Sequence, residues 1–160
     1  MPFPEITRPS PNFAATPAHE CHGVCFHHSV LGFDAALARL TDPASQVSYH
    51  CLIAPDGTRC TLVADEHIAW HAGASEFLGR TRCNDFLLGV AFAGDTHAAP
   101  LTAVQISSAL DWLAPRWARY GWTPPHMTDH RQIAPKRKDD LAPVEWERLF
   151  AAISSAYAPG

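Results

Sequence analysis

The five residues VCFHH at positions 24–28 decide the fold, because this largely apolar run predicts a short buried strand that ends in two histidines. Residues 31–32 break the run, and a helix is predicted from Asp34 to Leu40, with Asp34 as a possible N-cap. A strand followed directly by a helix is typical of α/β proteins.

The remaining elements continue this alternation, without internal repeats or a linker. Strands are predicted at 47–54, 58–64 and 86–92, and a Pro55-Asp56-Gly57 turn joins the first two. A helix is predicted to begin at a Thr102–Gln105 capping box and to kink at Pro115. A last helix is predicted after Pro143. We therefore predict one α/β domain over residues 21–160, with a central mixed β-sheet flanked by α-helices and an N-terminal arm of residues 1–20.

Composition excludes several kinds of partner. The net charge is -4, so no basic face for nucleic acid is expected. No apolar stretch approaches the roughly 20 residues that span a bilayer, and no polybasic membrane anchor is present. The first 17 residues lack the basic start and apolar core of a secretory signal peptide, which predicts a cytoplasmic protein.

Cysteine and histidine content point to different conclusions. The five cysteines predict reduced, mostly buried thiols, as in cytosolic proteins. Ten histidines, several of them clustered, favour metal chemistry.

The stretch DHRQIAPKRKDD at 129–140 carries the candidate chemistry. It places an imidazole, an ammonium and a carboxylate at His130, Lys138 and Asp140. Together with the histidine doublet at 27–28, it predicts a two-histidine, one-carboxylate metal site with a cation beside it. Spacing leaves open which histidine of the doublet is the ligand, because neighbouring side chains of a strand face opposite ways. Of His126 and His130, one ligand is favoured, since nearby prolines disfavour a helix.

Five segments then resemble one family in the same order. They are FHHS at 26–29, SYHCLI at 48–53, AWHAG at 69–73, RCNDF at 82–86 and the stretch at 130–140. Over residues 22–150 the chain is similar to the zinc-dependent N-acetylmuramoyl-L-alanine amidases, which include phage amidase lysozymes and peptidoglycan recognition proteins. WHAGAS at 70–75 and RCNDF resemble the AmpD-like branch most.

The resemblance implies a set of site residues. It implies Zn²⁺ held by His27, His130 and Asp140, and a fourth coordination position left for water, as in catalytic zinc sites. It implies that Lys138 stabilises the oxyanion. Four residues are expected on the substrate side, with Arg82 gripping a stem-peptide carboxylate: Trp70, His71, Arg82 and Asn84. His50, His19, His22 and His97 are expected to be structural.

The chain departs from the family in two places. AmpD-like enzymes carry Glu where this chain has Ala91 and Ala93, and the first of these is expected to manage the protons of the water. The hypothesis is that Tyr49 takes over this acid/base or oxyanion-orienting role; alternatively, the metal and Lys138 suffice and Tyr49 positions substrate. The loop around Asp140 also differs, with Lys136 for Gly and 141–143 reading Leu-Ala-Pro.

The resemblance implies hydrolysis of the amide between the lactyl group of N-acetylmuramic acid and L-Ala, in peptidoglycan or in soluble muropeptides. Two roles fit, namely cytosolic muropeptide recycling and a phage endolysin released to the wall at lysis. The alternative from another class is a non-catalytic muropeptide-binding module, which such proteins typically become by losing a metal ligand. A structural zinc site with four protein ligands is the third interpretation.

Overall fold

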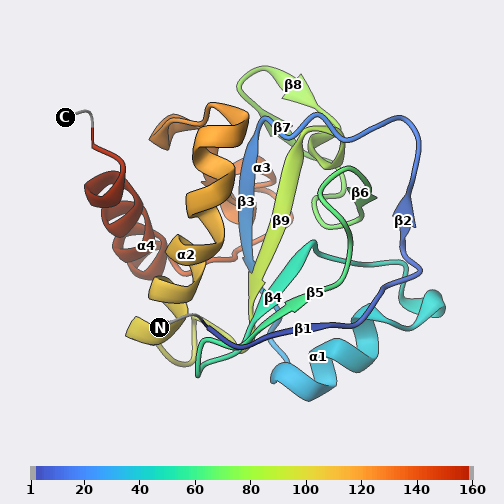
Figure 1. Ribbon diagram of the computed structural model, residues 1–160, viewed down its shortest axis with the longest axis horizontal. Coiled ribbons are helices and arrows are strands. Elements are labelled where there is room, and N and C mark those ends of the chain that lie inside the picture. Colours follow the sequence, from blue (N-terminus) through green and yellow to red (C-terminus); the bar gives the residue numbers. More distant parts are fainter. Residues whose placement is uncertain (1–2, 159–160) are drawn as a thin grey trace.

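A six-stranded sheet in the order β1-β5-β4-β9-β3-β10 forms the centre of the computed structural model, which describes residues 3–158 (Figure 1). Its strands are β1 (Glu5–Thr7), β3 (Gly23–His28), β4 (Cys51–Ile53), β5 (Arg59–Thr61), β9 (Leu87–Phe92) and β10 (Met127–Asp129). Only β4 and β5 pair antiparallel, and the other neighbours are parallel. The predicted α/β fold with a central mixed sheet is confirmed.

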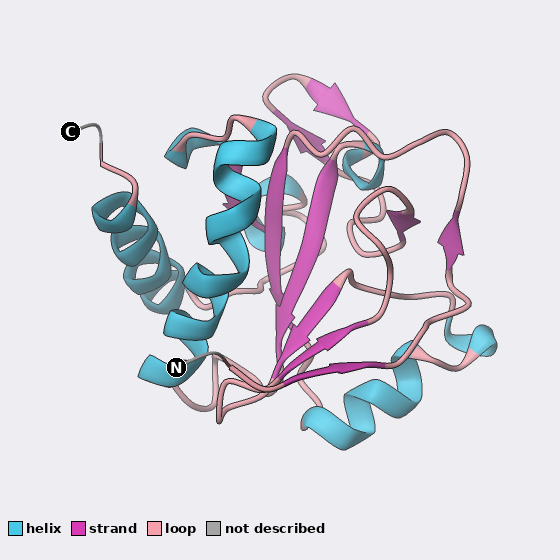
Figure 2. Ribbon diagram, viewed as in Figure 1, coloured by secondary structure: helices cyan, strands magenta, loops and turns pink. Residues whose placement is uncertain are grey.

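Helices cover both faces of this sheet (Figure 2). The long helices α2 (Ala103–Tyr120) and α4 (Pro143–Ala156) lie together on one side, and α1 (Phe33–Leu40) lies on the other. Alternating residues of β3 follow this division: Phe26 packs against Trp146 of α4, whereas His27 faces away from that core. The polar side chains of the site therefore lie on the face opposite α2 and α4.

The start of α2 matches the sequence signals, whereas the start of α1 differs from them. Thr102 and Gln105 form the predicted capping box of α2, and the helix continues past Pro115 to Tyr120. At α1 the N-cap is Gly32, without a side-chain cap, and Asp34 lies inside the first turn. The prediction of Asp34 as N-cap is therefore wrong by two residues.

Strands β4 and β5 are shorter than predicted. The turn between them is as expected, with Gly57 at a φ of 89°. Before β4, however, the Ser48 hydroxyl donates to Asn12 O and the Ser48 N–H donates to Trp70 O. These bonds tie Ser48 to loops, and β4 begins only at Cys51, so Tyr49 lies just outside the sheet.

The N-terminal arm pairs with the rest of the chain. Strand β1 forms the sheet edge beside β5, and Glu5 accepts hydrogen bonds from Arg59. Strand β2 (Phe13–Ala14) pairs with β6 (Ile68–Ala69). Residues 1–2 and 159–160 of the predicted arm and domain lie outside the described residues. A boundary at residue 20 stays a prediction.

The remaining short elements are β7 (Glu76–Phe77), β8 (Arg80–Thr81), α3 (His130–Ile133) and the 3₁₀ turns Pro43–Ser45, Cys83–Asp85 and Pro124–His126. All five cysteines are buried. Within residues 3–158, no helix has both the length and the apolar character needed to cross a bilayer.

Candidate metal centre

The candidate ligands meet where parallel strands end, as ligand sites of α/β sheets commonly do. His27 is the second-last residue of β3, and the register of β10 with β3 pairs Asp129 with Phe26. His130, which follows Asp129, therefore lies level with His27. The two Nδ1 atoms are 3.0 Å apart. The strand register thus selects His27 over His28 as His130's neighbour.

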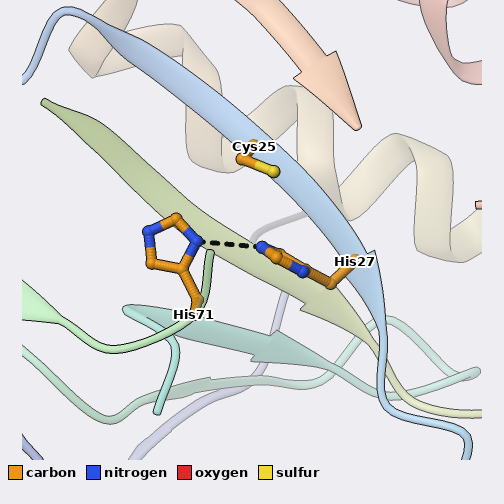
Figure 3. A group of neighbouring side chains, drawn as sticks. All are labelled: Cys25, His27 and His71. Atoms are coloured by element: carbon orange, nitrogen blue, oxygen red, sulfur yellow. Dashed lines mark hydrogen bonds between the residues drawn. The ribbon is translucent and has the colours of Figure 1, made fainter. Parts of the chain in front are cut away.

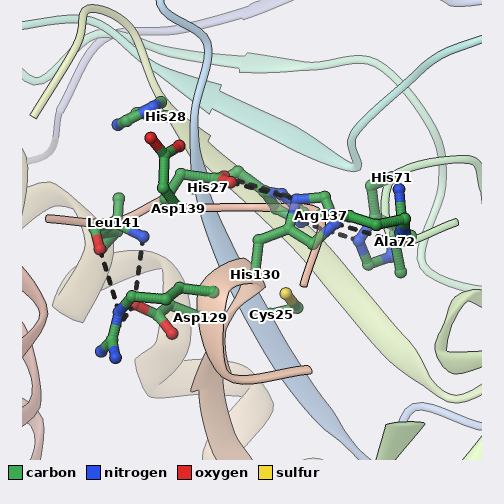
Figure 4. A network of polar contacts seen from close by, with 12 residues as sticks. Cys25, His27, His28, His71, Ala72, Asp129, His130, Arg137, Asp139 and Leu141 are labelled. Carbon is green, nitrogen blue, oxygen red and sulfur yellow. Dashed lines mark hydrogen bonds and ion pairs between the residues drawn. The ribbon is translucent and has the colours of Figure 1, made fainter. Parts of the chain in front are cut away.

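Asp129 fixes the loop that carries the third candidate. Its fully buried carboxylate caps α3 by accepting from the Gln132 N–H, and also accepts from the Leu141 N–H (Figure 4). The Arg131 N–H donates to Asp140 O at 2.6 Å. One buried carboxylate therefore holds both ends of the segment between His130 and Asp140. The unusual residues at 136 and 141–143 leave this convergence intact.

The spacing of the three donors fits a small divalent ion. Asp140 Oδ2 lies 3.4 Å from His27 Nδ1, and Asp140 Oδ1 lies 3.3 Å from His130 Nδ1. Ligands about 2.1 Å from a tetrahedral Zn²⁺ are about 3.4 Å from one another. Each of these contacts therefore has the length expected between two ligands of one ion, and one donor atom from each of the three residues lies within 4.8 Å of the others.

Electrostatics favours the protonation states that bind metal. Burial lowers the pKa of His27 to about 4, so its imidazole is neutral near pH 7. Burial alone would raise the pKa of Asp140, but hydrogen bonds with His130 and His27 outweigh it and hold that pKa well below its usual range. The site thus presents a neutral imidazole and an ionised carboxylate.

Two further groups have metal-like spacing. Cys25, His27 and His71 have ligand atoms within 4.8 Å of one another, as do His28, His97 and Asp139. In the first group (Figure 3), burial raises the pKa of the Cys25 thiol well above its usual range. Both ring nitrogens of His71 are occupied, by His27 Nε2 at 2.9 Å and Leu87 O at 2.9 Å. This group therefore offers a poorer ligand set.

A cavity of about 380 Å³ opens onto the candidate centre. His130 and Asp140 contribute to its lining, and Tyr49 and Lys138 line it as well. The Tyr49 ring centroid is 4.9 Å from that of His27. Burial raises the pKa of Tyr49, so its phenol stays protonated and acts as a donor. The two predicted catalytic residues and two of the three ligands therefore share one cavity.

The position of the missing Glu also lies at this centre. Ala91 of β9 pairs with His27 in the sheet register and is fully buried. A carboxylate at this position would lie beside the candidate ligands. In this chain only a methyl group is there, and a role for Tyr49 in its place stays a prediction.

The predicted substrate-side residues are not gathered in the cavity. Only His71 is among its lining residues. The Asn84 amide oxygen accepts from the N–H groups of His71 and Ala72, at 3.0 and 2.8 Å. Arg82 is exposed and pairs with Asp85. Trp70, Arg82 and Asn84 lie outside the lining, so substrate contact by them stays a prediction.

Sequence reasoning missed Arg39 of α1. This exposed residue lines the cavity, and among residues 3–158 its side chain has no ion-pair partner. Its helical position gave no signal, because only the tertiary fold brings α1 beside the 130–140 loop. By contrast, His50 is structural as expected, since it donates to His67 O and accepts from the Gly89 N–H.

Comparisons with known proteins point to one family. Residues 17–143 match the family model described as N-acetylmuramoyl-L-alanine amidase, Amidase_2. The N-acetylmuramoyl-L-alanine amidase AmiD of Escherichia coli (strain K12) is 35% identical over 139 residues, covering 77% of this chain and 50% of AmiD. The 1,6-anhydro-N-acetylmuramyl-L-alanine amidase AmpD of Enterobacter cloacae is 36% identical over 111 residues, covering 69% of this chain and 59% of AmpD.

Solved structures show the same likeness. The crystal structure of a selenomethionine AmpD derivative has a TM-score of 0.79 at 30% identity and covers 94% of both chains. Escherichia coli AmiD in complex with the substrate anhydro-N-acetylmuramic acid-L-Ala-D-γ-Glu-L-Lys has a TM-score of 0.73 at 31% identity, covering 86% of this chain and 59% of that one. The chain thus spans between half and three-fifths of the length of the two curated relatives.

Proposed function

Because the chain belongs to the N-acetylmuramoyl-L-alanine amidase family, we propose that it hydrolyses the amide between the lactyl group of N-acetylmuramic acid and L-Ala. The carrying observation is the convergence of His27, His130 and Asp140 within 3.0–3.4 Å of one another beside a cavity. Two imidazoles and one carboxylate form a ligand set that suits Zn²⁺ and leaves a fourth coordination position for chemistry.

The metal and the protein groups divide the work. When bound, Zn²⁺ would polarise the scissile carbonyl and lower the pKa of a water molecule. The Lys138 ammonium, which lines the same cavity, supplies a positive charge and N–H donors for the oxygen that becomes negative. The protonated Tyr49 phenol supplies a second donor and cannot serve as a base at neutral pH. The oxyanion-orienting role is therefore the part of the Tyr49 hypothesis that the site favours.

A soluble muropeptide or peptidoglycan is the proposed substrate. Support comes from the AmiD complex, whose ligand pairs an anhydro sugar with an acidic peptide. Such a peptide carries a free carboxylate on its γ-linked Glu, and the cavity offers Arg39 and Lys138 as cations. Cytoplasmic muropeptide recycling, which the similarity to AmpD suggests, belongs to the same proposal. Cell fractionation followed by immunodetection of the native protein tests this location.

Product analysis tests the activity. The purified chain, loaded with Zn²⁺, is incubated with a soluble anhydromuramyl tripeptide and, separately, with purified sacculi. Mass spectrometry is expected to show the free sugar and a peptide beginning with L-Ala, and chelation is expected to abolish both. Cleavage of sacculi would favour an endolysin role, and cleavage of the soluble substrate alone would favour recycling.

The competing interpretation is a muropeptide-binding module without catalysis. It predicts saturable binding of the tripeptide with no new peptide amino group after long incubation with Zn²⁺. That result, obtained with protein shown to contain one ion per chain, would overturn the proposed activity.

A further inference from the structure

In both candidate ligand imidazoles, Nε2 is linked to a backbone carbonyl by hydrogen bonds, but by a different route in each. His130 Nε2 lies 3.0 Å from Ala72 O. His27 Nε2 lies 2.9 Å from His71 Nδ1, and His71 Nε2 lies 2.9 Å from Leu87 O. One route is direct and the other passes through a third imidazole.

The donor and acceptor roles of the partners determine which ring nitrogen carries each proton. A carbonyl oxygen only accepts, so His71 Nε2 carries the hydrogen that Leu87 O receives. A neutral imidazole has one hydrogen, which leaves His71 Nδ1 as an acceptor. His27 Nε2 must then donate to it, and the lone pair of His27 is left on Nδ1. His130 Nε2 likewise donates to Ala72 O. The Nδ1 atoms of both rings face Asp140, and the bare Nδ1 of His27 is also the partner of His130 Nδ1 at 3.0 Å.

The position of the His71 ring is built into the fold. A Cβ at residue 89 would lie 2.6 Å from Cγ of His71, so only glycine lets the ring lie against β9. The Asn84 amide oxygen holds the backbone N–H groups of His71 and Ala72. Leu87 O is fixed on the other side, since it also receives a hydrogen bond from His19 Nε2. The ring therefore has one place and one set of partners.

We infer that His71 is a positioning residue that sets the tautomer of His27, so that its Nδ1 lone pair is ready for the metal before the metal arrives. This rests on the proposed metal site but not on the proposed reaction. His71 also lines the cavity, and the substrate contact expected of it stays a prediction. Hydrogen bonds from outer residues to metal-bound histidines typically change metal affinity by 10–100-fold.

The first test needs no substitution. Nitrogen chemical shifts of the imidazoles, measured by NMR on the full chain after chelation at pH 7, distinguish protonated from unprotonated ring nitrogens. The inference expects His27 protonated at Nε2 and bare at Nδ1, and His71 the same. His27 protonated at Nδ1 would overturn it.

The second test compares variants by Zn²⁺ competition with a chromophoric chelator. His71→Leu removes the acceptor and is expected to weaken Zn²⁺ binding by about 10–100-fold. His71→Asn places an amide oxygen near the former Nδ1 and is expected to restore most of this loss. His50→Leu is the matched control, because His50 is equally buried but bonds only to His67 O and Gly89 N.

The outcomes separate tautomer control from general destabilisation. If His71→Leu and His50→Leu lower Zn²⁺ affinity equally in folded protein, His71 has no special role and the inference fails. Amide hydrolysis is not measured in either test. Absence of amidase activity would therefore leave this inference standing, and loss of the tautomer signature would leave the proposed activity standing.

Discussion

Two groups of two histidines and one aspartate lie side by side and differ in burial and in their hydrogen bonds. The inner group is His27, His130 and Asp140, and the rim group is His28, His97 and Asp139. Two of the three positions are sequence neighbours, and both groups meet the same 4.8 Å spacing. Spacing therefore does not distinguish them. Burial does, because all three inner residues are buried whereas His97 and Asp139 are exposed, and so do the hydrogen bonds of the imidazoles.

At the rim, both imidazoles bond to neighbouring groups of the protein. The Thr96 N–H donates to His28 Nδ1 at 3.1 Å, so a neutral His28 keeps its hydrogen on Nε2. His97 Nε2 donates to Asp139 O at 2.9 Å and lies 3.4 Å from the Asp139 carboxylate. In the inner group the bare Nδ1 of His27 faces Asp140. The comparison indicates that the partners of the ring nitrogens make the inner group the better candidate metal site.

The neighbouring aspartates give the largest expected contrast. Asp140→Asn removes a charged ligand and should lower amide hydrolysis by at least about 1000-fold, because a bound metal contributes several kcal/mol to the transition state. Asp139→Asn removes an exposed carboxylate of the rim group and should leave turnover within about 3-fold. Rates are measured by liquid chromatography of the released peptide.

Zn²⁺ content accompanies each rate. The comparison breaks if Asp139→Asn loses the ion, or if Asp140→Asn retains both ion and activity. Equal losses in both variants would mean that the two groups act together.

The basic run beside the aspartates offers a second matched pair. Lys138 lines the cavity and Lys136 does not. Lys138→Ala should lower kcat by about 100-fold with Zn²⁺ affinity unchanged, as expected on removing one oxyanion donor. Lys136→Ala should behave as the unmodified protein. Steady-state kinetics on the soluble tripeptide tests this, and a change confined to KM would remove Lys138 from the chemical step.

Sequence predicted the fold well because its signals are local. The Thr102–Gln105 capping box and the start of α4 at Pro143 depend on residues close along the chain. Asp34 was misassigned as a cap because Gly32 begins the helix by backbone geometry alone. Strand β4 begins only after Tyr49 because Ser48 bonds to distant loops. No local sequence pattern encodes such bonds.

The site was predictable only in part. The family resemblance supplied His27, His130 and Asp140, whereas spacing left His28 and His126 as competitors. The sheet register separates them. It aligns β3 with β10, so His130 follows the end of β10 at the level of His27, whereas His126 comes before β10 begins. Arg39 and the orienting contact of His71 are tertiary facts. Asp129 did leave a signal, since aspartate just before a helical turn is a common N-cap.

Buried histidines should make stability depend on pH. Burial lowers the pKa of His50 to about 3 and that of His27 to about 4, whereas both titrate near 6.5 when unfolded. Between pH 4 and 6.5 the unfolded chain thus binds more protons, and the free energy of unfolding of metal-free protein should fall as pH falls. Each such histidine contributes up to about 1.4 kcal/mol per pH unit.

Urea unfolding at pH 5, 6 and 7 with chelator measures this slope. His50→Asn should reduce this slope by up to about 1.4 kcal/mol per pH unit, the contribution of one histidine. A slope that is the same in the variant would show that His50 is not neutral and buried as described.

The smallest expected effect concerns substrate choice. Arg39→Gln should raise KM for a tripeptide with a free γ-Glu carboxylate by about 5-fold, the size of an exposed ion pair of about 1 kcal/mol. The effect should vanish with a substrate in which this carboxylate is an amide. Arg82→Gln is the control, since Arg82 lies outside the cavity lining. A larger effect of Arg82→Gln would reverse the assignment.

X-ray absorption at the zinc edge tests the inner group most directly. With one Zn²⁺ per chain, the spectrum should show only nitrogen and oxygen neighbours at about 2.0–2.2 Å, including two imidazoles, and this pattern should change in Asp140→Asn. A sulfur neighbour at about 2.3 Å would place the ion at Cys25 and His71 instead, and would contradict the account.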